Sequence, residues 1–221
     1  APTYKEQDAK GDRWKVIPVL EDLKKKARAE GLWNMFMPPN EHEDDEFRGA
    51  GLSNLEYALL AEQMGHFYWA SEVFNCSAPD TGNMEVFMRY GTKEQKRQWL
   101  KPLMNGEIRS AFLMTEPAVA SSDATNIETS IKRDGDHYVI NGRKWFTSNG
   151  EAAAWALVMC RTEEGDGSGG VNEKMTQIIV PTDTPGFTIE RAVPVWGHSG
   201  GSHCEITYKD VGVPLENQVG S

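Results

Sequence analysis

The chain has 221 residues, a length that fits one or two domains. Apolar residues make up 39% of it, with seven Trp and eight Phe, which is enough for a buried core. The formal net charge of −10, with no basic run longer than Lys24–Lys26, disfavours binding to nucleic acid, and no apolar run is long enough to span a membrane.

Helical signals fill the first part of the chain. Apolar residues recur at helical spacing from Val16 to Glu30, and the following Gly31 is a typical stop signal. A capping box at Ser53–Glu56 predicts a second helix that runs to about Tyr68. This second helix carries an apolar stripe made of Leu55, Leu59, Leu60, Met64 and Phe67.

Two more helices are predicted before residue 106. Asp80 or Thr81 can cap the first of them, and Gly91 ends it. The second begins at another capping box, Thr92–Gln95, and ends before Asn105. The first part of the chain is therefore predicted to be an α-helical domain.

After residue 108 the apolar pattern changes to the alternation of strands. Turn residues separate short apolar runs at intervals that are typical of a β-sandwich or β-barrel. Strands are expected at residues 111–114, 127–133, 138–140, 143–146, 155–161, 175–180, 188–192 and 205–208.

Two of the connections between these strands are specific predictions. Asn141 and Gly142 tolerate positive φ at both positions of a type I′ turn, so a tight hairpin is predicted over His137–Ser148. The polar, glycine-rich stretch Thr162–Glu173 is predicted to be a mobile loop between the two strands of another hairpin.

The change of pattern predicts an α+β protein with two domains. We expect a helical domain over residues 1–109 and an antiparallel β-barrel or β-sandwich domain over residues 110–221. Ligands often bind in crevices between domains. The stretch Arg109–Gly150, which begins at the predicted boundary, is therefore the leading candidate for a binding site.

Cysteine usage bears on the cellular compartment. Cys76, Cys160 and Cys204 are scattered and odd in number, so no disulfide framework is suggested. The N-terminal residues are polar and show no secretory signal. These features predict a cytoplasmic protein.

Hydrolase and nucleotide-binding motifs have little support. Ser121 or Ser122 could join Asp123 and a histidine in a catalytic triad, but no G-x-S-x-G elbow surrounds them. The two serines are better explained as loop residues. No G-x-G-x-x-G follows a predicted strand and no P-loop is present, so a nucleotide cofactor would not bind in the Rossmann manner.

A metal site is a further alternative. His198, His203 and Cys204 are close in sequence, but they lack the spacing of H-x-H or C-x-x-C ligand pairs. An ordered turn before the final strand is the stronger explanation, and no metal is expected.

A flavin suits the stretch Arg109–Gly150 better. An isoalloxazine ring needs hydrogen-bonding partners along one edge and flat contacts on its faces. The competing interpretation is an ordinary β-domain core, in which the aromatic residues simply pack. The groups that could serve a flavin are the backbone of Phe112–Thr115, the hydroxyls of Thr115, Thr147 and Ser148, and the rings of Trp145 and Phe146.

The same stretch resembles a known family. Residues 114–126 read MTEPAVASSDATN, and residues 138–148 read YVINGRKWFTS. The upstream stretches Ala50–Tyr57 and Glu72–Glu85 fit the same pattern. From about residue 14 to residue 215 the chain is similar to the acyl-CoA dehydrogenase family, and most of all to the branch of its members ten and eleven.

The resemblance implies FAD as the cofactor. Phe112, Met114 and Thr115 match the run that holds the flavin edge. Phe146 matches a tryptophan that flanks the flavin, and Ser148 matches a threonine near its N5 and O4 atoms. Thr147, between them, is expected to bind the cofactor as well.

The resemblance also points to contacts with the acyl-CoA substrate. Ser121 and Ser122 fall where the family has one serine, which is associated with the FAD pyrophosphate and the acyl-CoA, and Ser122 is the better match. The helix after residue 81 resembles a wall of the acyl pocket. Its residues Thr81, Asn83 and Met84 are expected to line that pocket, whereas 194–202 departs from the family pattern.

The implied activity is that of an oxidoreductase of fatty acid β-oxidation. Such an enzyme oxidises a fatty acyl-CoA to the trans-2-enoyl-CoA and passes the electrons to an electron-transferring flavoprotein. The family's C-terminal four-helix domain is expected to be absent here, and with it the carboxylate that removes the α-proton. No residue of this sequence is therefore assigned as catalytic, and Glu116 is expected to be structural.

Full-length members of the family are expected to form homodimers or homotetramers. Two interpretations other than an enzyme of this kind stay open. The first is a non-catalytic remnant that binds acyl-CoA, flavin or a partner protein. A relative of the DNA-associated flavoprotein of the alkylation response is the second, which the excess of acidic over basic residues disfavours.

Overall fold

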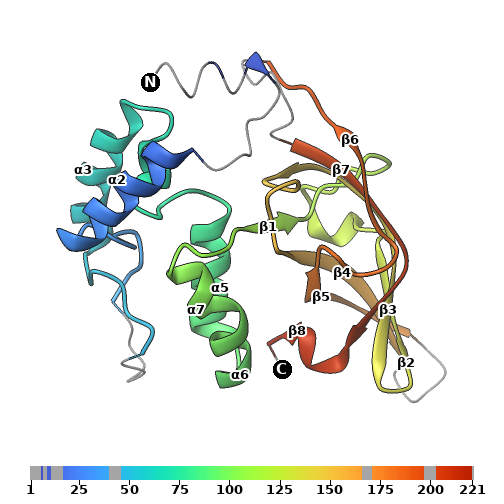
Figure 1. Ribbon diagram of the computed structural model, residues 1–221. Helices are drawn as coiled ribbons and strands as arrows, with labels where there is room; N and C mark the ends of the chain where they lie inside the picture. The colour runs from blue at the N-terminus through green and yellow to red at the C-terminus, as the bar shows by residue number, and fades with distance from the viewer. Residues whose placement is uncertain are drawn as a thin grey trace.

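The computed structural model describes residues 6, 9–10, 17–39, 46–165, 171–196 and 203–220. The α-helices precede residue 105 and the strands follow residue 109, and the two parts lie side by side in Figure 1. β1 (Ser110–Leu113) leads from the helical part into the sheet (Figure 1). The predicted α+β class is confirmed.

Within the described ranges, the helical part contains the four predicted helices, the last of them interrupted by a π-helical turn, and one short helix that was not predicted. Both capping boxes form, with Ser53 and Thr92 each bonded to the residue three positions later. Among the described residues, no helix is long and apolar enough to cross a membrane. The helices are α2 (Pro18–Ala29), α3 (Asn54–Gly65), α4 (Ala70–Val73), α5 (Asp80–Tyr90), α6 (Lys93–Gln95), a π-helical turn (Lys96–Leu100) and α7 (Lys101–Met104).

Two helical predictions differ from the structure. Neither Asp80 nor Thr81 caps α5; its N-cap is Pro79, and Asp80 is buried inside the first turn. The apolar stripe of α3 is not a buried face, because Leu55 is 78% exposed and only Met64 of the stripe is buried. The apolar period indicates the helix correctly, but it does not determine which side chains find packing partners.

In the described part of the chain, eight strands form a single sheet in the order β6-β7-β3-β2-β4-β5-β8, with β1 beside β4. Most neighbours are antiparallel, but β4 is parallel to both β1 and β2. Among the described strands β6 and β8 do not pair, so the sheet is open and the closed-barrel form of the prediction is wrong. The strands are β2 (Ser130–Asp134), β3 (His137–Ser148), β4 (Trp155–Gly165), β5 (Val171–Pro181), β6 (Phe187–Ala192), β7 (His203–Pro214) and β8 (Gln218–Val219).

The predicted hairpin at Asn141–Gly142 is wrong. β3 runs through these residues as one strand and pairs with β7 on both sides of them, with a register shift at Asn141. A Cβ atom on Gly142 would lie 2.7 Å from Cβ and Cγ2 of Thr129. The glycine therefore permits a close approach of the neighbouring segment, and the turn between β2 and β3 lies instead at Gly135, where φ is +62°.

The predicted loop Thr162–Glu173 is shorter than expected. β4 continues to Gly165 and β5 begins at Val171, and their residues pair in register up to these ends. Residues 166–170 lie outside the described part of the chain.

The two faces of the sheet contribute to different cores, because alternate residues of a strand point to opposite faces. Trp155, Leu157 and Ile179 pack with the buried residues of the helices. Ala156 and Val158, their neighbours on β4, pack inside the curved sheet. The helices thus cover one face of β4 and β5, next to the strand that carries the predicted site.

Candidate functional site

The residues that directly follow β1 lie against the second half of β3. Thr115 donates a hydrogen bond of 3.1 Å from Oγ1 to the carbonyl oxygen of Trp145. The N–H of Trp145 donates to the carbonyl oxygen of Thr115 over 3.0 Å. The structure therefore brings together two segments, 30 residues apart, that the sequence assigned to one site.

A bulge in β3 alters the direction of the chain at this contact. Between Lys144 and Thr147 the strand has one residue more than β7 opposite it. Within the bulge, Phe146 has φ of +50° and is 42% exposed. Positive φ in a bulky residue costs on the order of 1 kcal/mol and is often found at binding sites. The bulge exposes an aromatic ring beside the end of β1.

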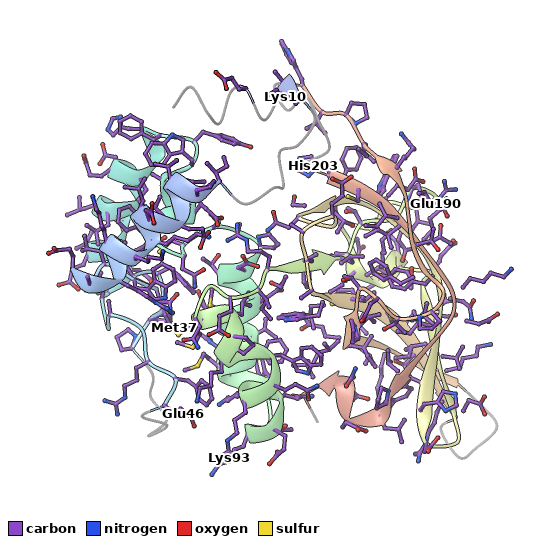
Figure 2. All side chains as sticks on the ribbon, viewed as in Figure 1. Lys10, Met37, Glu46, Lys93, Glu190 and His203 are labelled. Carbon is purple, nitrogen blue, oxygen red and sulfur yellow. The ribbon has the colours of Figure 1, made fainter. Side chains whose placement is uncertain are left out.

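Two hydroxyl groups follow the bulge. Thr147 is buried, and its Oγ1 has no hydrogen-bond partner among the described residues. Ser148 Oγ lies 2.9 Å from Nδ1 of His203, which Figure 2 shows at the start of β7. A hydroxyl can donate one bond and accept two, so Ser148 keeps capacity for a ligand.

His203 is one of the candidate metal ligands in the sequence, and in the structure its ring contacts Ser148. His198 lies outside the described residues. Cys204 is buried and free, as are Cys76 and Cys160. Within the described ranges, no group of three or more His, Cys, Asp or Glu side chains could hold a metal ion.

The two serines of the loop after β1 differ in their exposure to solvent. Ser121 is buried, and its hydroxyl accepts a hydrogen bond from the N–H of Glu116. Ser122 is exposed and can reach a ligand. Asp123 accepts bonds from the N–H and the hydroxyl of Thr125, which lower the pKa of its carboxyl. Asp123 therefore orders the loop, as expected of a loop residue rather than a member of a triad.

Glu116 and Lys144 form an ion pair of 2.7 Å, and both side chains are buried. The Glu116 carboxylate also accepts from the N–H groups of Glu128 and Thr129. Burial raises the pKa of Glu116, but these hydrogen bonds outweigh it and leave the pKa below its usual value. Glu116 is fully engaged, which agrees with the structural role expected for it.

Lys144 is a residue of this site that was not predicted from the sequence. Its signal is indirect, since a buried carboxylate such as Glu116 requires a cation nearby. Nothing in the alternation of β3 identifies which of its basic residues supplies that cation.

A cavity of about 460 Å³ lies between the helical part and the start of the sheet. Ile17 and Leu20 from the α2 region and Trp69 contribute apolar walls, and Ile108 contributes another near β1. Asn149, which follows Ser148, also lines it. The cavity is therefore lined by the residue that directly follows Ser148, one of the predicted flavin contacts.

Paired charges line another side of this cavity. Lys24 Nζ lies 2.8 Å from Glu21 and 2.6 Å from Glu72. Arg109 contacts Glu72 and also places Nε 3.2 Å from Asp80. These pairs join α2, α4 and α5 to the residue that precedes β1.

The three helical residues predicted to line the acyl pocket do not line this cavity. Asn83 donates to Ser110 Oγ at 2.8 Å and to the carbonyl oxygen of Ala111 at 3.2 Å. Met84 is fully buried in the core, and Thr81 is half-buried. Their contact with a substrate stays a prediction. Ser77 and Ala78, just before α5, line the cavity instead.

Two family models match nearly the whole chain. The model described as "Acyl-CoA dehydrogenase, N-terminal domain" matches residues 2–107. The one described as "Acyl-CoA dehydrogenase, middle domain" matches residues 111–211. The boundary between the two family matches, at residues 107–111, coincides with the change from helices to strands.

Individual proteins agree with this result. The chain is 50% identical over 220 residues to mouse acyl-CoA dehydrogenase family member 10, an alignment that covers 98% of this chain and 20% of the relative. A solved structure of a candidate acyl-CoA dehydrogenase from Mycobacterium abscessus is 44% identical, with a TM-score of 0.85, and the match covers 99% of this chain and 55% of that one. The chain thus spans about half or less of the length of these relatives.

A more distant solved structure contains a flavin. It is a glutaryl-CoA dehydrogenase from Mycobacterium smegmatis in complex with FADH2, 26% identical, with a TM-score of 0.68. The match covers 89% of this chain and 46% of that chain.

Proposed function

This chain belongs to the acyl-CoA dehydrogenase family, and we propose that the whole protein is an FAD-dependent acyl-CoA dehydrogenase. It would convert a fatty acyl-CoA into the trans-2-enoyl-CoA. The observation that carries this proposal is the contact between the end of β1 and the bulge of β3. It unites the residues that the family resemblance assigns to the flavin.

The residues present fit a flavin. Phe146 offers an exposed aromatic ring, and Ser148 offers a hydroxyl with remaining hydrogen-bonding capacity. Thr147 has a hydroxyl without a partner among the described residues. Phe112, Met114 and Thr115 would supply the backbone edge. Bound FAD would supply the acceptor for the hydride that leaves the acyl β-carbon.

This chain's own residues would then bind and orient the substrate. The exposed Ser122 would contact the FAD pyrophosphate or the acyl-CoA, whereas the buried Ser121 would order the loop beneath it. The cavity beside Asn149 would receive the acyl chain, because its walls are partly apolar and Asn149 directly follows Ser148, a predicted flavin contact. Glu116 is engaged in hydrogen bonds, so we do not assign it as the base that removes the α-proton.

Two further parts of the proposal concern other proteins. The electrons would leave to an electron-transferring flavoprotein, as the family resemblance implies. The full-length protein would form a homodimer or homotetramer, whose assembly is measurable by light scattering.

A visible spectrum tests the proposed function. Full-length protein purified with FAD should show flavin absorbance, and a fatty acyl-CoA added without oxygen should bleach it. Bound flavin without bleaching by acyl-CoAs of several chain lengths would favour the non-catalytic binding alternative. A protein that takes up no FAD would overturn the proposal.

Phe146→Ala tests the placement of the flavin. Loss of the ring should weaken FAD binding about fivefold, because a stacked aromatic contributes on the order of 1 kcal/mol. Tyr90→Ala, at the end of α5, removes a ring that is 61% exposed and should leave FAD binding unchanged. Quenching of FAD fluorescence measures both.

A further inference from the structure

Lys144 is a fully buried lysine near the middle of the sheet. It lies on β3, paired with Ile206 of β7, and its side chain has no exposed surface. A buried ammonium group is unfavourable unless several acceptors surround it. Its acceptors therefore show what the lysine does in the fold.

The ammonium group binds two acceptors just after β1. Nζ donates to the carbonyl oxygen of Met114 over 2.9 Å and to Oε1 of Glu116 over 2.7 Å. Glu116 in turn accepts from the N–H groups of Glu128 at 2.8 Å and Thr129 at 3.0 Å. The ion pair and these hydrogen bonds together connect the end of β1, the loop that follows it and the residues directly before β2.

The bond to Met114 determines the direction of a neighbouring donor. In a trans peptide the C=O and N–H groups point in opposite directions. Because Lys144 holds the Met114 carbonyl, the N–H of Thr115 must point away from the lysine. That N–H makes no hydrogen bond to the described residues. It is available to the flavin edge that the proposed function places here.

Stability alone does not account for this pair. Apolar residues of similar volume often replace a buried ion pair without loss of stability. An apolar side chain cannot hydrogen-bond the Met114 carbonyl, however, and so cannot orient the peptide.

We propose that Lys144, supported by Glu116, is a positioning residue that aims the Thr115 N–H at the flavin. This inference rests on the proposed function. The two residues act through the Met114–Thr115 peptide, and neither is assigned a contact with the reacting atoms.

The test separates positioning from stability by comparing single and double variants. Lys144→Met leaves the Glu116 carboxylate buried without its cation and should lower the urea midpoint. Adding Glu116→Leu removes that charge and should restore most of the midpoint. FAD affinity should nevertheless stay about tenfold or more below that of the wild type in the double variant, since the peptide is no longer oriented.

Hydrogen exchange gives a second measurement that does not need FAD. Amides in a peptide covering residues 112–116 should exchange faster in the double variant than in the wild type. Ile178→Ala, which truncates a buried residue of β5, is the control for a destabilised sheet. It should lower the midpoint without changing FAD affinity.

The outcomes distinguish the two proposals. If the double variant binds FAD within about twofold of the wild type and exchanges at the same rate, the positioning role is overturned. If the wild type binds no FAD, the proposed function fails. Exchange at residues 112–116 then decides on its own whether Lys144 orients this peptide.

Discussion

Asp80 accepts two hydrogen bonds of 2.7 Å from Ser110, one from the backbone N–H and one from the hydroxyl. Both residues are buried, and Arg109 Nε lies 3.2 Å from the other carboxylate oxygen of Asp80. Asp80 begins α5 and Ser110 begins β1. A side chain of the helical part therefore holds the start of the strand that leads to the candidate flavin site.

Asp80→Ala should lower the free energy of unfolding by about 2–4 kcal/mol. The change leaves the N–H and the hydroxyl of the buried Ser110 without their acceptor, and among the described residues Arg109 keeps only its contact with Glu72. Urea unfolding followed by tryptophan fluorescence measures the loss.

Asp80→Asn is the matched variant, and it should lose less. Burial raises the pKa of Asp80 in spite of the nearby Arg109 and Ser110, so an uncharged side chain of the same shape is tolerated better. Asp22→Ala, at a side chain that is 70% exposed, should change stability by less than about 0.5 kcal/mol. Equal losses for Asp80→Ala and Asp22→Ala would contradict the role of Asp80.

Glu116 should make the free energy of unfolding depend on pH in the acidic range. Its pKa is lowered in the folded protein, so its contribution is present above the unfolded value of about 4.3 and disappears as the pH falls through the folded pKa. Glu116→Gln should therefore lower the free energy of unfolding by about 3 kcal/mol at pH 7, because Lys144 loses its counter-ion.

The difference between wild type and Glu116→Gln should shrink between pH 5 and the lowest pH at which the protein stays folded. Urea midpoints at several pH values measure it. If the difference stayed constant over this range, the pKa of Glu116 would be the same in the folded and the unfolded protein, and the prediction would be wrong.

Gly142→Ala should destabilise the sheet by about 1–3 kcal/mol, the usual effect of overpacking. The new Cβ would lie 2.7 Å from two carbon atoms of Thr129, so β3 or the neighbouring segment must shift. Gly82→Ala is the control, because a Cβ there meets no atom within 4 Å and the site is helical. It should instead raise stability by about 0.5–1 kcal/mol, as thermal unfolding of both variants can establish.

Leu20→Trp should shorten the acyl chains that the protein accepts. Leu20 lines the cavity between the two parts, and each methylene that can no longer be buried loses about 0.8 kcal/mol. Excluding two of them weakens binding of the longest substrates about tenfold. FAD affinity should not change.

Val19→Trp, on the same helix, is the control for the cavity. Val19 is 47% exposed and does not line the cavity. Titrations with acyl-CoAs of increasing length compare the two variants. If both show the chain-length profile of the wild type, the acyl group lies elsewhere.

Local signals in the sequence predicted most of the elements. The capping boxes at Ser53 and Thr92 form because their partners lie only three residues away. Strand positions were predictable because alternation reflects burial of one face. The segments of the candidate flavin site, which the structure brings together, were predicted from residue types that suit one planar ligand.

Predictions failed where a distant residue decides the conformation. Asn141–Gly142 has the composition of a tight turn, but β7 pairs with both sides of it and keeps the chain extended. Asp80 has the composition of a helix cap, but Ser110, 30 residues away, takes its carboxylate. In both cases a tertiary contact outweighs a preference worth on the order of 1 kcal/mol.

By itself, the sequence determined the α+β class, the order of helices and strands, and the family, because these follow from short-range patterns and motifs. Only the tertiary structure decided that Lys144 meets Met114 and Glu116, and that Phe146 is exposed by a bulge. A buried charge needs a partner, but no local pattern states which residue that partner is. The partner depends on how β1 and β3 are placed in the sheet, and that placement is set by the packing of the whole chain.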